Sequence, residues 1–148
     1  MDSDSRTAVL ARGFQETNTV RVFPCGWNER AARFQPASIA GPVEQLRKLI
    51  SKDLRLEHAV IVFTYDGEPG LSHQDRELFW SAFAVPVFEQ YLDRRNELLA
   101  MECDAHSGLH VVTGCDDLPL EREVCACGSM TPRLSRTARI EELVELLA

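Results

Sequence analysis

The chain has 148 residues, of which 45% are hydrophobic and 26% are charged. These proportions are typical of one soluble folded domain and argue against disordered or fibrous proteins. The formal charge is −7, and basic clusters interleaved with aromatic residues are missing, so we expect no nucleic-acid binding.

The N-terminal part of the chain alternates between helix and strand patterns. Residues 8–14 have a mildly helical pattern, and residues 19–23 (TVRVF) alternate with the β-branched side chains that strands favour. Residues 27–34 predict a short helix with Trp27 and the alanines facing inward. This region therefore predicts a helix, a strand and a second helix.

A longer helix and a buried strand are predicted next. Gly41 and Pro42 indicate a helix start, because proline at the first helical position gives up an amide that has no partner there. The apolar spacing that follows predicts an amphipathic helix to about Asp53. The continuous apolar run 59–65 (AVIVFTY) is typical of a strand buried on both faces, and 66–70 is its turn.

A further helix is predicted from its cap and its apolar stripe. Ser72 is the expected N-cap, with Asp75 three residues later forming a weak capping box. We expect the apolar stripe on this helix to be core. Its members are Leu78, Phe79, Ala82 and Phe83.

The remaining elements are short strands and a last helix. Residues 86–91 predict a strand, and the runs 98–103 and 109–112 predict a hairpin joined by a polar turn. The acidic stretch 116–123 is expected to be a solvated loop, and the spacing of apolar residues in 139–147 predicts a C-terminal helix.

Three cysteines and one histidine near the C-terminus have a spacing that suits a metal site. Six residues separate Cys103 from His110, fourteen separate His110 from Cys125, and a single alanine precedes Cys127. Gly128 lets the Cys-x-Cys turn bend so that both sulfurs face one point. Three thiolates and an imidazole form the closed tetrahedral set that zinc prefers, which favours a structural ion.

Two other residues remain alternatives as ligands. His106 and Cys115 both lie between the predicted ligands. If either replaced one of the four and water completed the shell, Glu102 could act as a general base in a hydrolytic zinc site. Free cysteine is also a common buried hydrophobe, so spacing alone does not decide between these interpretations.

The order of these elements predicts an α/β fold. We expect a single domain, 1–148, in which a small sheet with flanking helices covers 7–100. A small β-rich zinc lobe is expected over 101–135, followed by the helix at 139–147. The apolar runs are too short to cross a bilayer, so we expect no membrane association. The sequence shows no export signal, so we expect a cytoplasmic location in which the five cysteines are reduced thiols.

Several weak motifs occur in an order that resembles one enzyme family. They are the Gly67-Glu68-Pro69 turn after a strand, Tyr91 after a helix and strand, Glu102-Cys103, Gly108-Leu109-His110, and Cys125-Ala126-Cys127-Gly128. Together they resemble the phenylacetate–CoA ligase branch of the adenylate-forming enzymes, over roughly half to two thirds of the chain. The resemblance implies the central portion of the N-terminal adenylating domain. It also implies zinc held by Cys103, His110, Cys125 and Cys127.

The departures from that family concern catalysis. Family members follow the tyrosine with a Gly-x-Thr/Ser-Glu segment, whereas Tyr91 is followed by Leu92-Asp93-Arg94-Arg95. The Ser/Thr/Gly-rich phosphate loop with its lysine is missing from the sequence, as is the mobile C-terminal domain. The sequence has a weak match to the family's ribose-binding Thr-Gly-Asp motif, which Cys115 interrupts. The resemblance therefore suggests a truncated, catalytically degenerate relative.

We consequently expect a non-catalytic zinc-binding protein that acts as an accessory or interaction module, either as a homo-oligomer or docked on a partner enzyme. One alternative is a small acyl- or nucleotide-binding protein or enzyme that retains part of the ancestral pocket. The acid–base groups available to it are His58, His73, His106, Glu68 and Glu89. The other alternative is the zinc hydrolase described above. We assign no catalytic residue.

Overall fold

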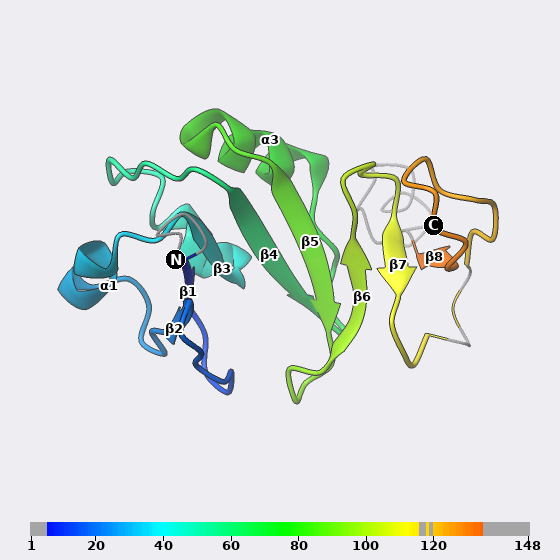
Figure 1. The fold of residues 1–148 in the computed structure, drawn as a ribbon, viewed down its shortest axis with the longest axis horizontal. Helices are drawn as coiled ribbons and strands as arrows, with labels where there is room; N and C mark the ends of the chain where they lie inside the picture. Colours follow the sequence, from blue (N-terminus) through cyan, green and yellow to red (C-terminus); the bar gives the residue numbers. More distant parts are fainter. Residues whose placement is uncertain (1–5, 116–117, 119, 135–148) are drawn as a thin grey trace, which may run out of the picture. The chain divides into compact units, whose positions relative to one another are not determined.

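The computed structural model describes residues 6–115, 118 and 120–134. These residues form a mixed α/β structure with one eight-stranded sheet and few helices (Figure 1). The strand order is β2-β1-β3-β4-β5-β6-β7-β8. Residue contacts divide the chain into a first unit, 1–63 with 77–87, and a second unit, 64–76 with 88–148.

Parallel strands form the sheet of the first unit. Their bounds are β1 (Thr7–Val9), β2 (Val20–Val22), β3 (Ser38–Pro42) and β4 (Ala59–Tyr65), whose last two residues belong to the second unit. β1 pairs with both β2 and β3, and β3 pairs with β4. Ala8, Ile39 and Val60 are completely buried along these strands, as expected for a parallel sheet covered on both faces.

Three helices lie in the described residues, and two of them carry side-chain caps. Their bounds are α1 (Glu29–Phe34), α2 (Val43–Arg47) and α3 (His73–Phe83). The Asn28 side chain accepts from the Ala31 N–H at 2.9 Å, and the Ser72 hydroxyl accepts from the Asp75 N–H at 3.1 Å. These bonds satisfy N–H groups that the first helical turn leaves without partners. None of the helices in the described ranges is long and apolar enough to span a membrane.

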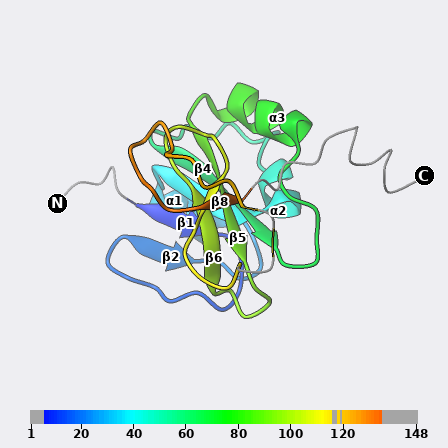
Figure 2. The ribbon, with the colours of Figure 1, turned by 90° about the vertical axis from the view of Figure 1, so that its right-hand side faces the viewer.

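Antiparallel strands form the sheet of the second unit, which Figure 2 views from the β8 side. Their bounds are β5 (Val87–Leu92), β6 (Leu98–Glu102), β7 (Leu109–Val111) and β8 (Arg133–Leu134). β6 pairs with β5 and β7, and β7 pairs with β8. Each of these strands contributes a side chain to one buried hydrophobic cluster, which includes Tyr91, Ala100, Leu109 and Leu134.

Several sequence predictions are confirmed. The strands expected at 19–23, 59–65 and 86–91 correspond to β2, β4 and β5. The hairpin expected from 98–103 and 109–112 is the antiparallel pair β6–β7. The N-cap at Ser72 is also present. Strong β-branched content and clear capping residues made these elements recognisable from local sequence.

The expected helix at 8–14 is wrong, because this segment begins within β1. The Thr7 N–H donates to the Thr19 carbonyl at 2.8 Å, and the Leu10 N–H donates to the Ala40 carbonyl at 2.7 Å. These partners lie far along the chain, so tertiary pairing overrides the weak local pattern. Strands β3 and β8 were not predicted either.

The helix expected from Pro42 to about Asp53 is much shorter. After Arg47 the backbone hydrogen bonds connect residues three apart: the Ile50 N–H, for example, donates to the Arg47 carbonyl at 3.2 Å. The chain therefore continues as tight turns. On α3, Phe79 and Phe83 are buried as predicted, but Leu78 is 41% exposed. The predicted helix at 139–147 and part of the acidic loop lie outside the described residues.

Candidate metal centre

The β6–β7 hairpin brings the first two predicted ligands together. Cys103 follows the last residue of β6, and His110 lies opposite Met101 in the β6–β7 register. The backbone N–H of His106 donates to the Cys103 carbonyl at 3.0 Å and closes the connecting turn. Gly108 has a φ of +98° in this turn, and an added Cβ would lie 3.3 Å from the Leu134 carbonyl oxygen. A glycine is therefore needed there.

The other two ligands belong to a tight turn next to β8. The Gly128 N–H donates to the Cys125 carbonyl at 2.8 Å, and the Cys125 N–H donates to the Ser129 carbonyl at 3.2 Å. Gly128 has a φ of +93°, a conformation that favours glycine. A few residues later, Arg133 of β8 pairs with His110 of β7. The turn is thus held beside the hairpin by strand pairing.

The four predicted ligands lie together, with all their ligand atoms within 4.8 Å of one another. The Sγ atoms of Cys103 and Cys125 are 3.6 Å apart. His110 Nε2 lies 3.3 Å from the Cys103 Sγ and 3.5 Å from the Cys127 Sγ. Bonds of about 2.3 Å to sulfur and about 2.0 Å to nitrogen in a tetrahedron require ligand separations of about 3.5 to 3.8 Å. The side chains are therefore arranged closely enough for one metal ion.

Electrostatics in the turn favours thiolate at Cys125. The pKa of Cys125 is lowered to about 6, chiefly because its thiolate is hydrogen-bonded to the backbone N–H of Cys127. Burial acts in the opposite direction and raises this pKa. The pKa of Cys103 is raised, first by burial and further by the neighbouring thiols. Thiolate is the form that binds metal. A cation among the three sulfurs would remove their mutual repulsion.

The imidazole of His110 presents one definite ligand atom. His110 is 9% exposed, and its Nε2 faces the cysteine sulfurs. Its buried Nδ1 has no hydrogen-bond partner within the part of the chain that the structure describes. The tautomer with the proton on Nδ1 leaves the Nε2 lone pair free for a metal.

The two alternative ligands lie outside this group. His106 Nδ1 bonds to the Glu102 carboxylate, and its ring stacks on Phe88 with centroids 5.0 Å apart. Cys115 is completely buried, and its Sγ lies 3.5 Å from the Thr113 carbonyl oxygen. Both side chains therefore have local roles in packing or hydrogen bonding.

Glu102 is the centre of a buried network beside the ligands. Its side chain is 2% exposed and forms a two-pronged ion pair with Arg76 at 2.8 and 3.0 Å. It also accepts the Glu89 N–H at 2.9 Å. Sequence reasoning did not find this network, because Arg76 is 26 residues away and no local pattern connects the two. With both oxygens engaged, Glu102 is poorly placed to act as a general base.

The other acid–base candidates are distributed over both units. His58 belongs to the first unit, whereas His73, Glu68 and Glu89 belong to the second. Glu89 is 1% exposed and accepts the Thr64 hydroxyl at 2.7 Å and the Leu71 N–H at 3.2 Å. Its contacts hold the segment after β4 against β5. Tyr91 donates to Asp66 at 2.6 Å and fixes the turn that contains Gly67-Glu68-Pro69.

Comparison with known proteins identifies a fold but no family. No family model matches the chain, and no curated protein matches it. Among solved structures, it is similar to an open conformation of 2-hydroxyisobutyryl-CoA ligase in complex with 2-HIB-AMP and CoA. The TM-score is 0.62 at 13% identity, over 90% of this chain and 44% of that chain. This chain therefore has a fold similar to that of a part of this ligase, and it spans less than half of the ligase's length.

Proposed function

We propose that Cys103, His110, Cys125 and Cys127 bind one structural zinc ion. The observation that carries this proposal is the close approach of the four ligand atoms, all within 4.8 Å. Soft thiolates and an imidazole suit zinc better than harder cations, and four protein ligands leave no coordination position for a substrate or water. A structural ion is therefore favoured over a hydrolytic one.

Zinc would add a cross-link between two segments that otherwise meet through the short pairing of β7 with β8. The β6–β7 hairpin supplies Cys103 and His110, and the turn before β8 supplies Cys125 and Cys127. β8 has only two residues, so its pairing with β7 contributes few hydrogen bonds. When ligands are brought together only in the folded state, metal binding stabilises that state.

Elemental analysis of protein purified without a metal-affinity tag tests this proposal. We expect about one zinc per chain, and release of zinc by a strong chelator should expose three thiols to a thiol reagent. The Cys25→Ser variant, which removes an exposed thiol outside the group, should keep its zinc. Protein that remains metal-free after incubation with zinc would contradict the proposal.

We further propose that the chain acts as a non-catalytic accessory or interaction module related to phenylacetate–CoA ligase-like enzymes. The fold similarity to a CoA ligase supports the coarser part of this proposal, and the motifs from Gly67 to Gly128 support the particular branch. A fold by itself does not establish an activity. Leu92-Asp93-Arg94-Arg95 after Tyr91 replaces the residues that handle phosphates and magnesium in that family. Calorimetric titrations with Mg-ATP and with CoA test this role. Saturable binding of either would instead favour the alternative of a retained acyl- or nucleotide-binding pocket.

Exposed apolar side chains support an interaction role. Trp80 is 55% exposed and Leu78 is 41% exposed on α3. Large exposed apolar residues are frequent at protein interfaces. We propose that they contact a second copy of the chain or a partner enzyme. Light scattering measures the assembly state, and the Trp80→Ser variant should shift it toward monomer if a second copy is the partner.

A further inference from the structure

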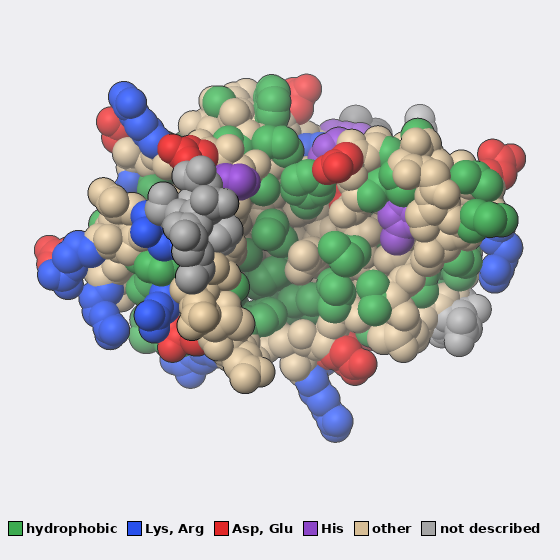
Figure 3. Space-filling model, in the orientation of Figure 1, with side chains coloured by type: hydrophobic (Ala, Val, Ile, Leu, Met, Phe, Trp, Pro, Cys, Tyr) green, Lys and Arg blue, Asp and Glu red, His purple; other side chains and the backbone are tan. Residues whose placement is uncertain are grey.

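A hollow of about 610 Å³ in the first unit has an excess of positive charge. It lies between α1, β2 and the turn that follows β2, and we call it the α1–β2 hollow. Its polar lining includes Arg21, Arg30, Arg33 and Glu16. Arg30 and Arg33 are three residues apart on α1, so they lie on neighbouring turns of one helix face. Figure 3 shows Lys and Arg side chains gathered over the α1 and β2 region at the left.

These arginines lack partners within the described ranges. None of the three guanidinium groups has an ion pair or hydrogen bond to another described residue. The carboxylate of Glu16, which also lines the hollow, accepts the Val22 N–H at 3.0 Å. Guanidinium groups form strong paired hydrogen bonds with phosphate and carboxylate oxygens. Three of them around one hollow favour an anionic ligand.

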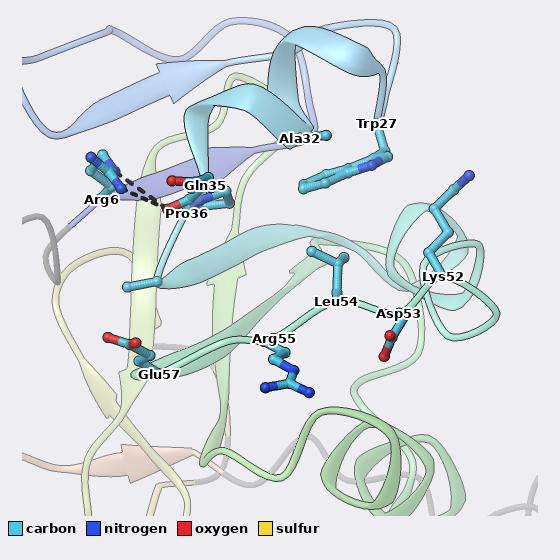
Figure 4. A pocket seen from close by; sticks show the side chains of 11 residues that line it. Arg6, Trp27, Ala32, Gln35, Pro36, Lys52, Asp53, Leu54, Arg55 and Glu57 are labelled. Atoms are coloured by element: carbon cyan, nitrogen blue, oxygen red, sulfur yellow. Dashed lines mark hydrogen bonds between the residues drawn. The ribbon is translucent and has the colours of Figure 1, made fainter.

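A second hollow bordering α1 shows a different charge balance (Figure 4). Its volume is about 590 Å³, and the acidic residues Asp53 and Glu57 accompany its basic residues Lys52 and Arg55. Its other cation, Arg6, donates to the Gln35 carbonyl at 3.1 Å. Figure 4 shows the indole of Trp27 on the side opposite Leu54, which makes part of the wall apolar. This hollow has less unpaired positive charge for an anion.

We propose that the α1–β2 hollow binds a small molecule carrying at least two phosphate groups. Arg21 comes from β2 while Arg30 and Arg33 come from α1, so separate anionic groups of one ligand can reach separate guanidinium groups. The net charge of −7 repels an extended polyanion. A basic hollow of this size on such a protein therefore suits a small ligand better than a nucleic acid.

The test is an NMR titration of the 148-residue chain with fructose 1,6-bisphosphate, and with fructose as the uncharged control. We expect saturable shifts of the arginine side-chain Nε–Hε signals of Arg21, Arg30 and Arg33, and of the amide of Cys25, which lines the same hollow. Fructose should produce none. All three arginines are exposed, so their replacement by glutamine should leave the fold intact, which circular dichroism can verify.

Matched double variants separate a site from general charge attraction. Arg30→Gln with Arg33→Gln should weaken binding by about tenfold or more, since it removes charged hydrogen bonds to the ligand. Lys52→Gln with Arg55→Gln removes the same charge from the second hollow and should leave the affinity within about twofold. Equal losses in both double variants, or the lack of saturable shifts, would overturn the proposal.

Discussion

Replacing Cys127 by serine isolates the contribution of metal binding to stability. Cys127 is exposed, whereas Cys125 is 3% exposed, so serine at 127 removes a ligand with little loss of packing. Its Sγ lies 3.5 Å from His110 Nε2, which places it among the ligands. We therefore expect the variant to fold but to bind zinc much more weakly.

The expected magnitude follows from linkage between binding and folding. Free zinc at about 100 times the dissociation constant of the native site stabilises the folded protein by about 2.7 kcal/mol. If the substitution weakens binding by two orders of magnitude or more, most of this stabilisation is lost. For a chain of this size, each kcal/mol changes the melting temperature by about 2–4 °C. The variant should therefore melt about 5–11 °C lower at the same free zinc concentration.

The measurement is a thermal melt of both proteins at buffered free zinc and again after complete metal removal. Without metal, the two proteins should melt within about 1–2 °C of each other, because Cys127 has little packing to lose. Cys25→Ser should match the native protein under both conditions. Equal melting of native protein and Cys127→Ser in zinc would refute the assignment of Cys127 as a ligand.

Three further predictions concern thiol ionisation, the buried ion pair and the core. In metal-free protein, the pKa of Cys125 is lowered from its ordinary 9.0 to about 6. Its thiolate therefore contributes its full stabilisation of the folded state above pH 9, and this contribution is lost as the pH falls to about 6. Urea unfolding of the native protein and of Cys125→Ser across that pH range should show this loss of stability. Arg76→Met leaves the buried Glu102 carboxylate without its cation and should cost about 3 kcal/mol, whereas the exposed Arg95→Met should cost under about 0.5 kcal/mol in the same urea assay. Phe79→Ala removes a completely buried ring and should cost about 3–5 kcal/mol. Trp80→Ala, at a half-exposed neighbour, should cost much less, and comparable losses would contradict the assignment of the buried face of α3.

The Glu102 network gives the proposed zinc site a rigid support. Glu102 precedes Cys103 and is held by Arg76 and by the Glu89 N–H. His106 in the connecting turn bonds to the same carboxylate. Buried, fully paired polar groups hold a backbone segment in one conformation. Zinc affinity should therefore fall moderately in Arg76→Met even though Arg76 is not a ligand.

The sequence by itself determined the elements whose information is local. The β-branched run of β4 predicted a strand, and Ser72 predicted the start of α3. The spacing of Cys103, His110 and the Cys-x-Cys turn identified four residues that the structure places together. A hairpin and a glycine turn are short-range features, so their residues carry enough information to be recognised without the rest of the fold.

Only the tertiary structure decided the features that depend on distant partners. β1 is a strand because it pairs on both sides with β2 and β3, despite a mildly helical local pattern. The Arg76–Glu102 pair likewise joins two segments that are 26 residues apart in the chain. Such contacts depend on how strands are ordered and packed, and neighbouring residues in the sequence do not specify that order.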